Sequence, residues 1–192
     1  RSATDPGERE RLWEGRRGSY AACARLAPNS MVEDGVVPRD RLPEIVRRIR
    51  GISERHGVKP ALIFHAGDGN IHPHMGYDER DAGQTARVSA AGQEILKACV
   101  ELGGSLSGEH GIGIEKRAAM AWLHTPRALR LLGDLKRTFD PEGLSNPDKI
   151  FPIESDAAPE GFAARADRPL SSAAAHVAGR VRECAAAGRP MA

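Results

Sequence analysis

A pair of segments on either side of residue 67 constrains the fold more than any other part of the chain. Residues 60–64 form an apolar run, and residues 70–77 alternate between apolar and polar side chains. Alternation with a period of two is typical of a strand with one buried face. Between them, Ala66-Gly67-Asp68-Gly69 has the composition of a tight turn. We therefore predict a β-hairpin, which requires an antiparallel sheet around it.

Two long helical patterns flank this hairpin. Residues 39–56 repeat apolar side chains at the spacing of one helix face, and Gly57 is a natural helix end. Residues 81–102 form a second helix pattern with its own apolar face. Strands and helices in this order favour an α+β fold, in which both helices pack on one face of an antiparallel sheet.

Shorter elements complete the predicted order. Asp5 can cap a first helix, and Leu12, Trp13 and Tyr20 supply part of its apolar face. Glu33 and Asp34 fall within a predicted strand, where we expect them to be solvated or to cap a loop. The remaining predicted elements are a helix over residues 5–26, a strand over 31–37, an irregular glycine-rich segment over 105–113 and helices over 114–123 and 126–139.

Composition divides the chain and excludes several functional classes. The net charge is +2 without a basic stripe, so nucleic-acid binding is not expected. No apolar run approaches the roughly 18 residues of a membrane span, and the polar start lacks a signal peptide. Cys23, Cys99 and Cys184 have no CxxC spacing, which favours reduced thiols in a cytoplasmic protein. We expect one domain over residues 1–153, and then a flexible linker and tail over 154–192 with a weak helix over 171–187.

Histidines gather around the predicted hairpin turn. His65 ends the first strand, His72 lies on the second, and His74 is two residues further on the same face. Pairing of the strands brings two imidazoles together, which is half of a transition-metal site. Glu109, in the glycine-rich segment, can supply a carboxylate as the third ligand. The alternative is that these histidines are ordinary surface or hydrogen-bonded core residues.

The glycine-rich segment from Gly103 to Gly113 has two interpretations. Its glycines could cradle a phosphate, but it lacks both the dinucleotide-binding fingerprint and a P-loop lysine. We favour a loop whose backbone approaches a flat ligand closely. Ser105 and Ser107 lack the context of a catalytic nucleophile.

Three motifs together make the chain recognisable. They are HAGDGNIHP from His65, GGSLSGEHGIGIEK from Gly103 and FDPEGLSNPDKIFP from Phe139. In this order and spacing they resemble the C-terminal region of the FAD-linked oxidases, which include D-lactate and D-2-hydroxyglutarate dehydrogenases. The likeness is greatest to the FAD-linked subunit of glycolate oxidase, and it covers residues 10–152.

The resemblance implies an architecture and a cofactor. It implies a ferredoxin-like antiparallel sheet that caps a flavin, with FAD bound mainly by an N-terminal domain. The chain lacks that domain and begins without Met, so we expect a piece of a longer enzyme that is inactive and flavin-free alone. Its partners would be a small 2-hydroxy acid, the flavin-binding domain or subunit and other oxidase subunits. Those subunits could also hold a cytoplasmic protein at the membrane periphery.

The resemblance also implies roles for individual residues. The resemblance implies that a divalent metal, often zinc in the better-understood relatives, would be bound by His65, His72 and Glu109. His110 would take the substrate's hydroxyl proton. The remaining implied positions are Arg16 and His74 for substrate, and Gly108, Gly111 and Asn146 for cofactor.

Two positions depart from the family pattern. Val32 stands where the 2-hydroxyglutarate enzymes have a lysine, which argues against a dicarboxylate substrate. Asp148 stands where the third motif usually has glycine.

Two other functions compete with an oxidoreductase part. One is a metal-binding module, either alone or completing a separate flavin domain, and the other is a metal-dependent hydrolase. A loop that ends in a histidine beside a ligand carboxylate suits a flavin cap better than a hydrolase.

Overall fold

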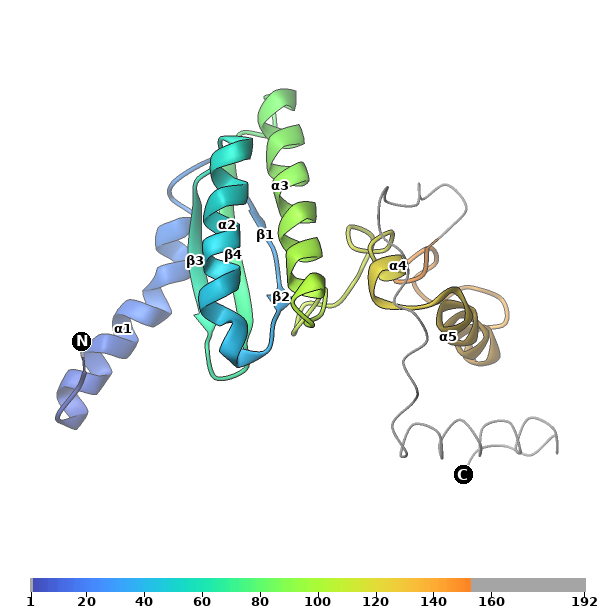
Figure 1. The fold of residues 1–192 in the computed structure, drawn as a ribbon, viewed down its shortest axis with the longest axis horizontal. Helices are drawn as coiled ribbons and strands as arrows, with labels where there is room; N and C mark the ends of the chain where they lie inside the picture. Colours follow the sequence, from blue (N-terminus) through green and yellow to red (C-terminus); the bar gives the residue numbers. More distant parts are fainter. Residues whose placement is uncertain (1, 153–192) are drawn as a thin grey trace.

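A small antiparallel sheet, covered on one face by two helices, forms the centre of the structure (Figure 1). This computed structural model describes residues 2–152. The fold is α+β, as predicted. In chain order the elements are α1 (Pro6–Cys23), β1 (Asn29–Val32), β2 (Gly35–Val36), the 3-10 turn η1 (Arg39–Arg41), α2 (Leu42–His56), β3 (Pro60–His65), β4 (Asn70–Tyr77), α3 (Ala82–Glu101), α4 (Met120–Leu123) and α5 (Pro126–Phe139).

Strand β4 is the centre of the sheet. It pairs antiparallel with β3 on one side and with both β1 and β2 on the other. The predicted hairpin is confirmed, because His65 pairs with Asn70 across the turn. Beyond β2, an isolated bridge joins Val36 to Ser105, at the position of a fourth strand. The chain thus follows the strand–helix–strand–strand–helix path of ferredoxin-like folds, with a fourth strand reduced to one bridge.

The predicted strand over residues 31–37 is interrupted. Glu33 and Asp34 separate β1 from β2, and our expectation that they are solvated was wrong, since 6% and 0% of their surfaces are exposed. Asp34 does cap a loop, because its backbone carbonyl accepts a hydrogen bond from Gly108 N at 3.0 Å. Local hydrophobicity did not reveal this long-range pairing.

The two faces of β4 have different environments. Ile71 and Met75 are completely buried against α2 and α3, where they join Ile45, Ile49 and Ile95 in the main core. Side chains alternate along a strand, so His72 and His74 lie on the opposite face. The open face of the sheet therefore holds the histidines.

Helix α1 lies outside this two-layer core (Figure 1). Asp5 caps it as predicted, accepting a hydrogen bond from Glu8 N at 2.9 Å. The expected apolar face is not buried within residues 2–152, and 54% of Trp13 is exposed. Only Tyr20 reaches the sheet in a described ring contact, its edge meeting the His74 ring with centroids 5.3 Å apart.

Helices α4 and α5 lie beyond α3 (Figure 1). The helix predicted over residues 114–123 is only four residues long, since the residues before Met120 form turns after Gly113, where φ is 58°. A second core, which includes Leu106 and Trp122, joins α4 to α3. Helix α5 leaves a stripe of apolar side chains exposed at Leu131, Leu135 and Phe139.

Three further expectations concern the C-terminal tail, the cysteines and membrane-spanning helices. The linker and tail over 154–192, with its weak helix and Cys184, lie outside the described residues. Cys23 is half-buried and Cys99 is buried, and neither forms a disulfide with a described residue. Over residues 2–152, we find no helix with the length and hydropathy needed to span a membrane.

Candidate metal and substrate site

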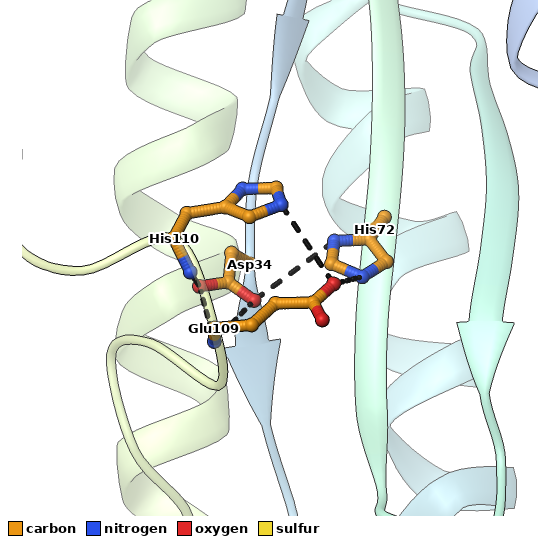
Figure 2. A group of neighbouring side chains, drawn as sticks. All are labelled: Asp34, His72, Glu109 and His110. Carbon is orange, nitrogen blue, oxygen red and sulfur yellow. Dashed lines mark hydrogen bonds and ion pairs between the residues drawn. The ribbon is translucent and has the colours of Figure 1, made fainter.

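Polar side chains from three separate segments gather on the open face of β4 (Figure 2). His72 lies on β4, Asp34 lies at the break between β1 and β2, and Glu109 and His110 lie in the glycine-rich loop after α3. His65, at the end of β3, completes the group from the neighbouring strand. The hairpin predicted from sequence positions His65 and His72 together, because His65 pairs with Asn70, and Asn70 and His72 lie on the same face of β4.

The side-chain carboxylate of Glu109 is the meeting point of this group. Its Oε1 lies 2.9 Å from His72 Nε2, 3.3 Å from His65 Nε2 and 3.8 Å from His110 Nε2. The His65 and His72 rings lie edge to face with centroids 5.3 Å apart, and the His110 ring stacks on His72 at 5.0 Å. The three residues predicted as metal ligands are therefore close together.

The surroundings of His72 determine which of its ring nitrogens is available. Nδ1 lies 3.3 Å from the backbone oxygen of Glu33, which can only accept, so the tautomer with the proton on Nδ1 donates there and leaves the Nε2 lone pair free. Nε2 is buried and has no hydrogen-bond partner among residues 2–152, despite its proximity to Glu109 Oε1. A backbone carbonyl that accepts from one ring nitrogen, so that the other nitrogen can bind an ion, is typical of metal-binding histidines.

Asp34 also lies in this cluster, but its oxygen atoms are already in use. Asp34, His72, Glu109 and His110 each offer a ligand atom, and these atoms lie within 4.8 Å of one another. Burial alone would raise the pKa of Asp34, but hydrogen bonds from Ser107, His110 N, Asn70 and Glu109 N outweigh it and hold this pKa well below its usual range. We therefore favour His65 over Asp34 as a ligand, although that four-residue group does not include His65.

The backbone of the glycine-rich loop points inward. Gly108 N, Glu109 N and His110 N all donate to Asp34 Oδ2, at 3.1, 3.1 and 2.8 Å. Such a row of N–H groups binds anions, and here the chain's own carboxylate occupies it. This occupancy argues against the phosphate-cradle interpretation.

Of the two residues predicted to bind substrate, His74 lies next to the cluster. His74 is buried, and burial, followed by the charges of His72 and His110, lowers its pKa. Val32 pairs with His74 across β1 and β4, which puts an apolar side chain beside it. Arg16 is half-buried one turn before Tyr20 on α1, on the same helix face. Among the described residues its guanidinium has no ion-pair partner, so the predicted contact of Arg16 with substrate stays a prediction.

The predicted cofactor positions are at the surface, but they do not form one cluster. Gly108 and Gly111 are exposed in the loop, whereas exposed Asn146 lies in the segment after α5. That segment is bound to the loop region, since Ile150 N donates to Gly113 O at 2.8 Å. Asp148 has φ 58°, a left-handed conformation that suits the glycine usual in the family.

Sequence analysis missed two residues of the site. Asp34 anchors the loop. Lys116 Nζ is buried, has no hydrogen-bond partner in the described part of the chain and lies 3.8 Å from Asp34 Oδ2. Adjacent carboxylates inside an apolar strand were the available signal, because buried charges need partners.

Comparison with known proteins identifies the family. Residues 1–150 match the family described as FAD linked oxidases, C-terminal domain. The chain belongs to this family. It is 41% identical over 152 residues to glycolate oxidase subunit GlcD of Escherichia coli strain K12, covering 79% of the chain and 30% of that protein.

Two more distant relatives extend the range of this FAD-linked oxidase domain. Glycolate oxidase subunit GlcD of Bacillus subtilis is 36% identical over 140 residues, covering 73% of the chain and 30% of that protein. A probable mitochondrial D-lactate dehydrogenase of Danio rerio is 31% identical over 153 residues, covering 79% of the chain and 31% of that protein. The chain thus spans about 30% of the length of these relatives.

Proposed function

We propose that this domain is the substrate- and metal-binding part of a flavin-dependent oxidoreductase that acts on a small 2-hydroxy acid such as glycolate or D-lactate. The observation that carries the proposal is the approach of His65 Nε2 and His72 Nε2 to within 3.3 and 2.9 Å of Glu109 Oε1. The names of the relatives supply the substrate class. Val32 beside His74 favours an acid without a second carboxylate.

The donor set fits a divalent metal, and zinc in particular. Two neutral imidazoles and one carboxylate, with room for further ligands, are typical of catalytic zinc sites. Half of the Glu109 side chain is exposed, so substrate oxygens can reach the same point. When bound, the ion would polarise the substrate's hydroxyl and carboxylate oxygens.

The other residues complete the proposed chemistry. His110 stacks on His72 and is half exposed, which suits a base that removes the substrate's hydroxyl proton. His74 and Arg16 would bind the substrate beside the metal. Gly108, Gly111 and Asn146 are exposed, as contacts with a flavin require. When bound by the partner domain, FAD would supply the acceptor for the hydride of the substrate carbon.

A flavin-binding domain or subunit is the proposed partner. Leu131, Leu135 and Phe139 form an exposed apolar stripe on α5, and Trp13 is exposed on α1. Exposed apolar patches commonly mark interaction surfaces. The word subunit in the names of two relatives supports further oxidase subunits as additional partners.

Zinc titration of the purified 192-residue chain tests the metal site. We expect one ion per chain, and the substitutions His65→Ala, His72→Ala and Glu109→Ala should each lower the affinity by at least about tenfold. His56→Ala is the matched control, since His56 pairs with Glu94 at 2.8 Å, outside the cluster. Equal zinc affinity in all four variants would contradict the site.

Flavin reduction tests the activity. The domain, combined with the FAD-binding part, should bleach the flavin absorbance when glycolate or D-lactate is added without oxygen. The Glu109→Ala enzyme should not. Zinc-dependent ester hydrolysis by the chain without flavin, and no bleaching, would favour a hydrolase instead.

A further inference from the structure

The unassigned polar residue with the most connections to the site is Asp34. Its oxygens touch the loop that carries Glu109 and His110, and also Asn70 at the start of β4. We propose that Asp34 is the positioning residue that fixes Glu109 and His110 relative to the histidines of the hairpin. The proposal rests on the function proposed above and adds a residue to its site.

Asp34 fills an anion-binding nest made by the loop. Three successive backbone N–H groups, from Gly108 to His110, converge on Oδ2, and Ser107 Oγ donates to the same oxygen at 2.5 Å. Ser107 Oγ in turn accepts from Gly111 N at 2.7 Å. The carboxylate therefore determines the path of the backbone on both sides of Glu109.

The same short segment also holds the hairpin side of the site. Asp34 Oδ1 accepts a hydrogen bond from Asn70 Nδ2 at 2.9 Å, and the carbonyl of Glu33 accepts from His72 Nδ1. Two adjacent residues thus bind both the loop with the carboxylate and the strand with the imidazole. At the break between β1 and β2, the Asp34 carboxylate and the Glu33 carbonyl face the site, so the interruption of the strand supplies both contacts.

Asp34 itself is poorly suited to bind the metal. Oδ2 accepts from four donors, and Oδ1 accepts from Asn70 and, at 3.3 Å, from Glu109 N. Its side chain is completely buried, and Lys116 Nζ lies 3.8 Å from Oδ2. A buried carboxylate with this many charge-assisted hydrogen bonds is fixed in place. Its effect on the metal would therefore act through Glu109.

Asp34→Asn is the direct test, because the amide keeps the shape but turns an N–H₂ group toward N–H donors. We expect zinc affinity of the full chain to fall by about 10- to 100-fold, the usual cost of losing a residue that orients a ligand. Ser107→Ala removes one donor of the nest and should cause a smaller loss in the same direction. If Asp34→Asn does not fold, Ser107→Ala still decides the question, and unchanged affinity in it would overturn the proposal.

Met75→Ala is the control for a general loss of stability. Met75 lies on the same strand as His72, is completely buried and faces the helices. This variant should unfold more readily than the unsubstituted chain, yet bind zinc within about threefold of it. If Met75→Ala and Asp34→Asn lost zinc affinity equally at matched stability, Asp34 would contribute only to the stability of the core, and the proposal would be wrong.

Amide hydrogen exchange separates this proposal from the proposed function. Without metal, the N–H groups of Gly108, Glu109 and His110 should be protected in the unsubstituted and Met75→Ala chains and exchange faster in Asp34→Asn. If the unsubstituted chain binds no zinc, the metal site is wrong, and the exchange data still decide whether Asp34 holds the loop. Equal protection in Asp34→Asn would overturn the proposal whatever the zinc result.

Discussion

Glu109 and His110 are adjacent in the chain, but their side chains have different relations to the histidines of the hairpin. The carboxylate lies between His65 and His72, whereas the His110 imidazole stacks on His72 and stays 3.8 Å from Oε1. In the enzyme combined with its flavin part, His110→Ala should keep its zinc and lose roughly two to four powers of ten in turnover, the usual scale for one general base. Glu109→Ala should lose its zinc. Metal analysis of the purified variants, beside their turnover numbers, gives both results.

The opposite result would make His110 the metal ligand and Glu109 the base. Zinc lost in His110→Ala and kept in Glu109→Ala would make the imidazole a ligand. Turnover that persists in both variants would show that this cluster does not carry the reaction.

Gly108 and Gly111, both in the glycine-rich loop, differ in how much space a side chain would find. A Cβ at position 108 would overlap Asn70 Nδ2 and lie 2.8 Å from Val36 Cγ2, whereas a Cβ at Gly111 meets no atom within 4 Å. Asn70 is held by Asp34 and cannot easily move, so Gly108→Ala should destabilise the fold by about 1–3 kcal/mol and weaken zinc binding. Gly111→Ala should cost only about 1 kcal/mol, because its φ is 84°. Urea unfolding of both variants measures the difference, and equal losses would mean that the loop adjusts around position 108.

Sequence predicted the histidines of the site, whereas the two adjacent carboxylates at positions 33 and 34 signalled only that Asp34 needs partners and not which partners it has. His65 and His72 belong to one hairpin, where the period of a strand determines which side chains share a face. Asp34 contacts residues more than 70 positions away, such as Glu109 with a separation of 75. No local period encodes a contact between a strand break and such a distant loop. The resemblance supplied Glu109, whereas spacing alone left it a candidate.

The helices differ in how much they contribute to stability. Ile49 on α2 is completely buried in the main core, whereas Trp13 on α1 is 54% exposed. Ile49→Ala should therefore lower the free energy of unfolding by about 2–5 kcal/mol. Trp13→Ala should change it by no more than about 0.5 kcal/mol, as at other surface positions. Chemical denaturation followed by circular dichroism compares them, and a large loss in Trp13→Ala would mean that α1 belongs to the folding core.

Sequence predicted helices best where one face is buried along its whole length. The patterns of α2 and α3 were sufficient because each contributes a continuous apolar face to the main core. The segment before α4 also looked helical, but only Met120–Leu123 forms a helix. Lys116 within it turns inward toward Asp34, so tertiary charge pairing competes there with helical geometry. Similarly, the carboxylates at positions 33 and 34 interrupt a strand that local propensity would continue.

Helix α3 joins the two cores into one molecule. Ile95 and Cys99 belong to the core under the sheet, while Leu96 and Val100 belong to the core with α4. Neighbouring residues on one helix thus face different layers, and loss of α3 would expose both. This arrangement makes a buried side chain of α3 a reporter on the whole fold.

Cys99 provides that reporter. It is completely buried, and burial, followed by the charge of Glu33, raises the pKa of its thiol to about 12. At pH 8 the thiol of the folded chain is therefore almost entirely protonated, and thiolate is the form that reacts with disulfide reagents. We expect Ellman's reagent to modify half-buried Cys23 readily and Cys99 only on unfolding.

Peptide mass spectrometry, performed across a guanidinium series, locates each modification. Labelling of Cys99 should follow the loss of helical circular dichroism, because exposing this thiol requires α3 to separate from both the sheet and α2. Labelling of Cys23 should precede that transition, since its helix has no buried residue. The Ile49→Ala substitution should move the Cys99 transition to lower denaturant without changing the order of the two thiols. Rapid labelling of Cys99 in native buffer would show that α3 opens locally, and the two cores would then be separate cooperative units.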